Sequence, residues 1–503
     1  MLEKIDMNEV KKKLEEEMIT GIIEYLKHGA EPNNSPGSYM NSYSIVLNIT
    51  NKYREEGGEK LFNYHNEIIE SFIEFCYKDI SQQSNDLFID SFIKNTEKIN
   101  NLIYWMRRIF TYLDKHYLQD NKRNIKTTLS KTSMELYKAK FFVPLEKEIY
   151  KELNKLIKDD RNGNFESRPK IKAVLNIIDN LDLFSPIIEK ENKSILWMAE
   201  KGTKGRNLRE FGDRWYNGTF SEETTIFAKE KANCDINSLS AYEYIISQLK
   251  YLDEENARKS DYINPNYHNY IDKINHKILI GENAEELAKM DTGISYMFTN
   301  KRNDELIKVY DLISLHPESL KVITDALHAY IRKRGEEISK NKEISKDPKR
   351  FIPQLISLKK EMDNLIKDCF KNNPNFQDVK NKAFSTFMNK EFYAKQLSNY
   401  TDYCMKSGFK GKSEEEVENK INEIIDLFKC LNVKLTFQIE SNKKLSDRLI
   451  KGSSVSINHE KKFISKLRQE SGLNYVSKMS QMMNDLDKNK NEIDEYKALA
   501  HRG

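Results

Sequence analysis

Apolar residues recur at intervals of three and four positions along almost the whole chain, which is the period of an α-helix. Between Asp304 and Ile331 they form two stripes on either side of the dipeptide His316-Pro317. The stripes consist of Leu306, Val309, Tyr310 and Ile313, and then of Leu320, Ile323, Leu327, Tyr330 and Ile331. Each stripe must be buried against a neighbour, so the pattern predicts two antiparallel helices joined by a short turn.

The sequence contains no long stretch of alternating apolar and polar residues, the pattern of a half-buried strand. The segment VKLTFQIE (433–440) is strand-like in composition, but the spacing around it favours a helix. Ser413, with Glu416 three residues later, has the pattern of a helix N-terminus. The polar segment 159–164 predicts a charged turn that ends a helix, and 452–462 predicts a flexible loop. The predicted fold class is all-α.

Composition supports helices with a large charged surface. Charged residues make up 32% of the chain and hydrophobic residues only 38%, below the roughly 45–50% of an average globular chain. The 24 Phe and 26 Tyr are nevertheless far more aromatic residues than a disordered chain carries. With 18 Gly and 10 Pro, the chain has too few turn residues for a sheet protein. These features suit repeated helical layers around slender cores.

Neither the charge nor the apolar content points to nucleic acid or to a membrane. The 82 Lys and Arg nearly balance the 78 Asp and Glu, whereas nucleic-acid binding needs clustered positive charge. No apolar run approaches the roughly 18–20 residues that span a bilayer, and the charged N-terminus lacks the apolar core of a signal peptide. The five widely spaced cysteines suit reduced thiols. We therefore expect a soluble protein of the cytoplasm, the nucleus or both.

No sequence motif for catalysis is present. Gly-rich phosphate loops, H-E-x-x-H, G-x-S-x-G and EF-hand loops are all missing. The nearest pair of histidines, His268 and His276, is eight residues apart, and no two cysteines have a metal-ligand spacing. We therefore expect no catalytic residue, no metal site and no cofactor, and we interpret the chain as a binding scaffold rather than an enzyme.

Five segments, in order along the chain, resemble the cullin family. GSYMNSYSIVLNIT (37–50) is similar to the helix with which cullins dock an adaptor, and IFTYLDKHYL (109–118) is similar to the helix packed beside it. FFVPLEKEIYKELNKLIKDDRNG (141–163) follows the family's Pro-Leu step, long helix and terminal R-N-G. LFKCLNVKLTFQIESNKKLSDRLIKGSSVS (427–456) and FISKLRQESGLNYVSKMSQMMNDL (463–486) resemble the start of the cullin homology region.

The resemblance implies an elongated stalk of three five-helix cullin repeats followed by a helical bundle. We expect repeat 1, with the adaptor-binding end, at residues 1–130, repeat 2 at 131–255, repeat 3 at 256–400 and the start of the cullin homology region at 401–503. The family's later region, which holds the RING-box protein, has no counterpart before Gly503. The resemblance thus implies a non-catalytic scaffold of a cullin-RING ubiquitin ligase in ubiquitin-dependent protein degradation, which by itself binds an adaptor but no RING-box protein.

The first segment resembles the subtype that binds a Skp-type adaptor with its F-box receptor. Leu47, Trp105 and Arg107-Arg108 depart from the pattern of that subtype. Helical spacing alone favours core packing for the apolar stripe in this segment. The resemblance instead implies a set of adaptor-binding residues, namely Tyr39, Met40, Tyr43, Val46, Leu47, Ile109, Tyr112, Leu113, His116 and Tyr117.

Three alternatives remain open at this level. A cullin with a BTB-type adaptor would have the same architecture. A helical-rod subunit in tethering or trafficking would share both the architecture and the lack of catalytic motifs, and binding to a partner on vesicles would identify it. A helical repeat that binds nucleic acid is the third alternative, and salt-sensitive affinity for DNA or RNA would identify it.

Overall fold

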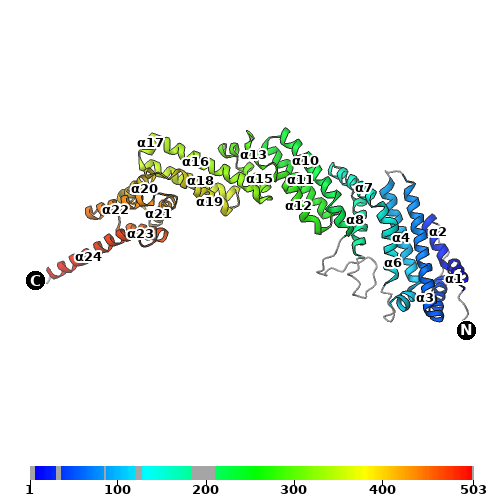
Figure 1. The fold of residues 1–503 in the computed structure, drawn as a ribbon. Coiled ribbons are helices and arrows are strands. Elements are labelled where there is room, and N and C mark those ends of the chain that lie inside the picture. The colour runs from blue at the N-terminus through cyan, green and yellow to red at the C-terminus, as the bar shows by residue number, and fades with distance from the viewer. Residues whose placement is uncertain (1–5, 30–35, 84–86, 120–126, 184–209, 501–503) are drawn as a thin grey trace. The chain divides into compact units, whose positions relative to one another are not determined.

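The computed structural model describes residues 6–29, 36–83, 87–119, 127–183 and 210–500. Helices account for nearly all of these ranges and none of them contains a strand, so the predicted all-α class is confirmed (Figure 1). The chain divides into two compact units. Unit 1 comprises residues 1–230 and 252–275, and unit 2 comprises residues 231–251 and 276–503. This division is coarser than the expected three repeats and bundle, whose boundaries stay a prediction.

Unit 1 is an array of helices around one hydrophobic core. In it α3 packs against α4 and α6, and α4 packs in turn against α7 and α8 (Figure 1). π-Helical turns η1 (Glu15–Ile19), η3 (Asp114–Leu118) and η4 (Lys138–Phe142) interrupt or end α-helices of the array. The helices that lie wholly in unit 1 are α1 (Met7–Leu14), α2 (Thr20–His28), α3 (Pro36–Ser81), α4 (Phe88–Ile109), α5 (Thr111–Leu113), α6 (Leu129–Tyr137), α7 (Val143–Arg161), α8 (Arg168–Leu183) and α9 (Glu210–Tyr216). The next three, α10 (Thr219–Ser238), α11 (Ala241–Asp261) and α12 (His268–His276), contribute residues to both units.

Helix α7 illustrates how the sequence builds this array. Pro144 stands at the second position of α7, directly after the π-helical turn η4, where the hydrogen-bond pattern of the helix changes. Buried apolar residues then repeat every four positions, at Leu145, Ile149, Leu153 and Ile157. The helix ends at Arg161 and Gly163 follows with φ 97°, a backbone conformation that favours glycine. The predicted helix-ending turn at 159–164 is confirmed.

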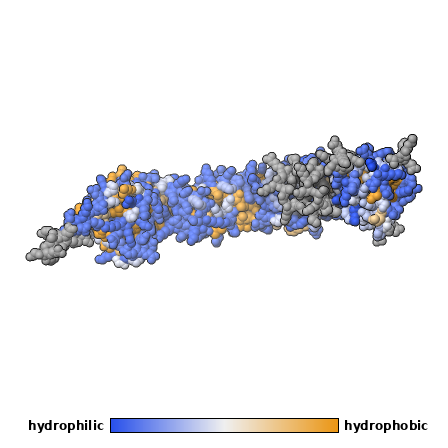
Figure 2. All heavy atoms as spheres, turned by 90° about the horizontal axis from the view of Figure 1, so that it is seen from below, coloured by the Kyte–Doolittle hydropathy of each residue, from blue (hydrophilic) through white to orange (hydrophobic). Residues whose placement is uncertain are grey.

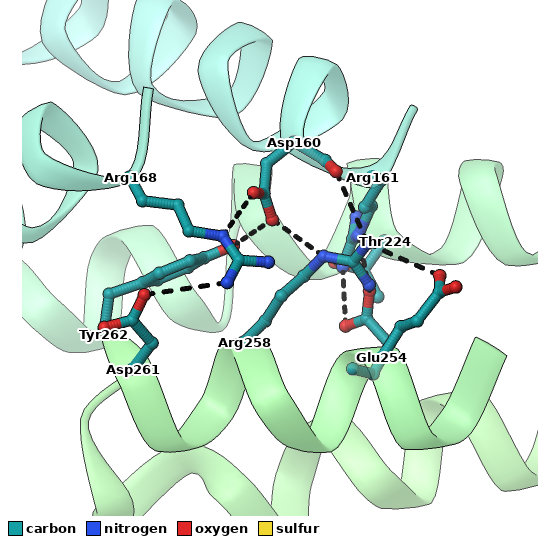
Figure 3. A network of polar contacts seen from close by, with 9 residues as sticks. Asp160, Arg161, Arg168, Thr224, Glu254, Arg258, Asp261 and Tyr262 are labelled. Carbon is teal, nitrogen blue, oxygen red and sulfur yellow. Dashed lines mark hydrogen bonds and ion pairs between the residues drawn. The ribbon is translucent and has the colours of Figure 1, made fainter. Parts of the chain in front are cut away.

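A buried network of charges connects the end of α7 to α11 within unit 1 (Figure 3). The fully buried carboxylate of Asp160 accepts hydrogen bonds from the Nε atoms of Arg168 and Arg258, at 2.7 Å and 2.8 Å. The Tyr262 hydroxyl donates to the same carboxylate at 3.1 Å. Two guanidinium groups therefore share one carboxylate that has no access to water, an arrangement in which every member depends on the others.

Glu255 is the second shared carboxylate of the network. Arg161 donates to both of its oxygens, at 2.9 Å and 3.3 Å, and Arg258 donates to Oε1 at 3.1 Å. Arg161 also donates to Thr224 Oγ1 at 3.1 Å, which adds α10 to the network (Figure 3). The side chains of Arg161, Glu255 and Arg258 are each 3% exposed. Charge pairing and hydrogen bonds thus replace the water that these buried groups have lost.

Unit 2 contains the helix pair predicted between Asp304 and Ile331. α15 (Asn303–Ile313) and α16 (Leu320–Lys340) are joined by the short 3₁₀ turn Pro317–Ser319. All four residues of the first stripe are buried, as are Ile323, Leu327 and Ile331 of the second. The other described helices of unit 2 are α13 (Ala284–Lys289), α14 (Ile294–Thr299), α17 (Lys342–Ser345), α18 (Pro348–Cys369), α19 (Pro374–Phe387), α20 (Glu391–Tyr403), α21 (Glu414–Lys429), α22 (Lys434–Lys451), α23 (Ile457–Ser471) and α24 (Ser477–Ala500), with π-helical turns η8 (Lys277–Gly281) and η10 (Cys404–Gly408).

Two local predictions in unit 2 are confirmed. The strand-like segment 433–440 is helical from Lys434 onward, as the first part of α22. The Ser413 hydroxyl accepts from the Glu416 N–H at 3.3 Å, while the Glu416 carboxylate accepts from the Ser413 N–H at 2.9 Å. This reciprocal pair is a capping box, and it begins α21 as the spacing predicted.

The flexible loop predicted at 452–462 is wrong beyond Ser456. Helix α23 begins at Ile457, and Glu460 in its first turn is 1% exposed. The Glu460 carboxylate accepts from Arg448 Nε and NH2, at 2.7 Å and 2.8 Å, and from the Ser454 hydroxyl at 2.8 Å. The third guanidinium nitrogen, Arg448 NH1, donates to Asp402 at 2.8 Å. The polar residues of this segment therefore serve a buried ion pair rather than a solvated loop.

On the face drawn in Figure 2, hydrophilic side chains cover most of the described surface and hydrophobic ones form scattered patches. Within the described ranges, no helix combines the length and the apolar character needed to cross a bilayer. Many large apolar side chains of unit 1 are gathered in its core.

Candidate functional site

The expected adaptor-binding residues come from two neighbouring parts of unit 1. The first is the beginning of α3, residues 36–53, which a kink at Arg54 (φ 44°, ψ −108°) separates from the rest of that helix. The second runs from the end of α4 through α5 to η3, and α3 packs against all three. Six of the expected residues are at least partly accessible, and we call this set the aromatic face: Tyr39, Met40, Tyr43, Leu47, Tyr112 and His116.

The rings of the aromatic face contact one another. Tyr43 lies between Tyr39 and Tyr112, with ring centroids 6.5 Å away on each side, and its ring stands edge-on to Tyr112. Tyr112 stacks on His116 at 4.2 Å and donates its hydroxyl hydrogen to Asn51 Oδ1 at 2.7 Å. These contacts restrict the side chains before any partner arrives, which lowers the entropy that binding would cost.

The other four expected residues lie beneath the aromatic face. Val46, Ile109 and Leu113 have no exposed surface and Tyr117 is 5% exposed. All four belong to the hydrophobic core of unit 1. In this conformation they cannot touch a partner, because other side chains cover them. The family resemblance implied contact for them, whereas their burial gives them a role in supporting the face.

Gly58 fixes how closely η3 approaches α3. A Cβ atom at Gly58 would lie only 2.2–2.6 Å from three ring atoms of the buried Tyr117. We expect Gly58→Ala to lower the free energy of unfolding, since overpacking costs about 1–3 kcal/mol. Alanine gains about 1 kcal/mol over glycine in a helix, and a clash this short outweighs that gain. Urea denaturation measures the change. If the clash with the Tyr117 ring is the cause, the double variant Gly58→Ala/Tyr117→Leu will lose less stability than the sum of the two single variants. Losses that add fully would contradict this cause.

The aromatic face adjoins three residues outside the expected set, namely Tyr104, Trp105 and Arg108. The guanidinium of Arg108 lies over the rings of Tyr39, Tyr104 and Trp105, at 5.6 Å, 5.5 Å and 5.7 Å from their centroids. Arg108 NH1 also donates to the Tyr104 hydroxyl at 2.8 Å. Trp105 and Arg107-Arg108 are positions at which the sequence departs from the pattern of the Skp-binding subtype.

Among the described residues, no group of three or more His, Cys, Asp and Glu side chains is arranged to hold a metal ion. The aromatic face itself carries no acidic residue. Its chemistry consists of large aromatic rings, a methionine and a nearby guanidinium, which are the side chains enriched in protein–protein interfaces.

The sequence matches the family model described as the cullin alpha solenoid domain over residues 13–492. It is 23% identical over 452 residues to Cullin-3A of Arabidopsis thaliana, an alignment that covers 89% of this chain and 57% of that protein. Cullin-3 of Dictyostelium discoideum is 23% identical, with coverages of 89% and 54%, and Cullin-4A of Homo sapiens is 24% identical, with coverages of 78% and 48%. The chain thus spans about half the length of these relatives, and their names do not support the expected Skp-type subtype. Because the family model covers residues 13–492 of 503, the chain belongs to the cullin family.

Proposed function

We propose that this chain is a non-catalytic scaffold subunit of a cullin-RING ubiquitin ligase in the cytoplasm, the nucleus or both. The observation that supports this function is the cullin match over residues 13–492. In this role the helical array holds an adaptor and its substrate receptor in place for ubiquitin-dependent protein degradation. A fixed arrangement raises the effective concentration of the groups that must react.

The aromatic face is our candidate for the adaptor-binding site. Tyr rings give large contact area with few rotatable bonds, and Met adapts its shape to a partner. Met40 is 56% exposed in the absence of a partner. The relatives named Cullin-3 favour a BTB-type adaptor as the first candidate, and a Skp-type adaptor with its F-box receptor is the second.

The test is a pull-down of the purified chain with a BTB-domain adaptor and, separately, with a Skp-type adaptor bound to an F-box protein. We expect Tyr43→Ala to weaken binding about tenfold or more, because a central aromatic side chain of an interface contributes above 1 kcal/mol. Met40→Ala should act in the same direction. Thermal melting of each variant, monitored by circular dichroism, checks that the helices remain folded.

Tyr25→Ala is the matched control, since Tyr25 is 45% exposed and lies on α2, apart from the aromatic face. It should bind like the wild type. Equal loss of binding in Tyr25→Ala and Tyr43→Ala would remove the aromatic face as the site. If the folded wild type binds neither adaptor, the scaffold proposal fails and a tethering subunit becomes the next hypothesis.

A further inference from the structure

Arg108 is held in a defined position on the surface of unit 1. Its guanidinium lies near three rings, at the distances given above, and the Tyr104 hydroxyl accepts a hydrogen bond from NH1. The Tyr39 hydroxyl in turn donates to the Arg108 carbonyl oxygen at 3.5 Å, which ties α3 to the end of α4. An arginine arranged in this way loses little conformational entropy when it binds a partner.

The Arg108 guanidinium nevertheless remains exposed, and it forms no ion pair with a carboxylate of the described ranges. Cation–π contact and one hydroxyl leave most of its five donors available. A planar donor group of this kind matches the two oxygens of a carboxylate.

The charges around Arg108 favour an acidic partner. Residues 36–54 contain no acidic residue, and residues 105–118 contain one, Asp114. Asp114 is buried, accepts a hydrogen bond from the Leu129 N–H at 3.0 Å and interacts electrostatically with Arg107 and Lys115. Basic residues of the two segments outnumber this single acidic one even without Arg108, namely Lys52, Arg54, Arg107 and Lys115. On the η1 side, Glu17 reaches the surface as an acceptor for Asn41.

We infer that Arg108, held by Tyr39, Tyr104 and Trp105, is a specificity-determining residue that binds a carboxylate on the adaptor protein. The inference rests on the proposed function, because it names the chemistry that the partner presents beside the aromatic face. The aromatic face supplies contact area, and Arg108 selects an adaptor that carries an acidic side chain at the matching position.

Affinity measurements on the whole chain test the inference, with purified BTB-domain adaptor and Skp-type adaptor–F-box pair as probes. We expect Arg108→Ala to raise Kd about tenfold and Arg108→Glu about a hundredfold, with melting unchanged because the side chain is exposed. Arg108→Lys should recover only part of the loss, since an ammonium lacks the planar fork. Lys94→Ala is the control and should stay within about threefold of the wild type, because Lys94 is an exposed basic residue of α4 outside the two segments.

A charge reversal identifies the partner group. An adaptor variant with a surface Asp or Glu changed to Arg should restore binding to Arg108→Glu and lose binding to the wild type. If the wild type binds and Tyr43→Ala does not, but Arg108→Ala binds normally, the inference is overturned and the proposed function stands. The inference is also overturned if Arg108→Ala loses binding but no charge-reversed adaptor variant restores binding to Arg108→Glu. A wild type that binds no adaptor overturns both.

Discussion

Replacing Asp160 by asparagine should lower the free energy of unfolding of unit 1 by about 3–5 kcal/mol. The substitution keeps the shape of the side chain, so it opens no cavity. It removes the charge that Arg168 and Arg258 share and turns one acceptor oxygen into a donor that faces a guanidinium. Asp160 is fully buried and Arg258 is 3% exposed, so water cannot replace what is lost. Breaking a buried ion pair leaves an uncompensated charge in a medium of low dielectric constant.

Asp90→Asn is the matched control in the same unit. Asp90 pairs with Lys170 at 2.7 Å, but both side chains are nearly half exposed, at 45% and 44%. Exposed pairs contribute about 0–1 kcal/mol, so this variant should unfold close to the wild type. Urea denaturation, monitored by circular dichroism, gives the transition midpoints of the two variants and the wild type. Similar midpoints for Asp160→Asn and Asp90→Asn would show that the network contributes no more than a surface pair.

Acidification should destabilise unit 1 through His65, by about 2 kcal/mol between pH 7.5 and pH 5 and about 3 kcal/mol by pH 4. His65 is 1% exposed and lies edge-on to Phe110 at 5.4 Å. Burial lowers the pKa of His65 to about 4, while its hydrogen bond with Asn66 acts weakly in the other direction. In the unfolded chain the His65 imidazole has an ordinary pKa near 6.5, so between pH 6.5 and pH 4 it binds a proton that the folded chain does not bind. Stability present above pH 6.5 is therefore lost as the pH falls toward 4.

His65→Leu isolates this effect from the carboxylates that titrate in the same range. Urea denaturation at pH 7.5 and pH 5 gives the loss of stability for each protein. We expect the loss to be about 2 kcal/mol smaller for His65→Leu than for the wild type. His28→Gln is the control, because His28 is 64% exposed and should leave the loss unchanged. A His65→Leu protein that loses as much stability as the wild type would refute the prediction.

Local pattern was enough to predict much of the helical architecture. The stripes of α15 and α16 repeat with the helical period because each helix buries one side, and the buried residues of both helices bear this out. The segment 433–440 was harder, since its composition suits a strand. Helical spacing decided it correctly, and α22 buries Phe437, Ser441 and Leu445 at four-residue intervals.

The buried charges could not be predicted in the same way. The sequence around Asp160 has the composition of a solvated turn, and a turn is indeed present. Its partner Arg258 comes 98 residues later along the chain. The residues next to a charged side chain in the sequence do not show whether it will be buried against a distant partner or exposed to water. The same reason accounts for Glu460, which was assigned to a loop and is buried against Arg448.

For the candidate site, the family resemblance identified the two segments, but the sequence did not show which side of each faces the core. Val46 and Leu47 are adjacent, yet Val46 has no exposed surface and Leu47 is partly accessible. That difference depends on where α4 and η3 pack, which the sequence of α3 does not contain. The Arg108 contacts were missed for a similar reason, because Tyr39 reaches them from another helix.

The two shared carboxylates of unit 1 also limit how this sequence can evolve. Asp160 serves Arg168 and Arg258, and Glu255 serves Arg161 and Arg258, so any single change leaves buried charges facing former partners. Apolar residues of matching shape can replace such a set without loss of stability, but only when several positions change together. Each single-step intermediate is therefore expected to be less stable than the chain with the complete network. Natural selection can therefore preserve the network over long lineages even where a simpler core would fold equally well.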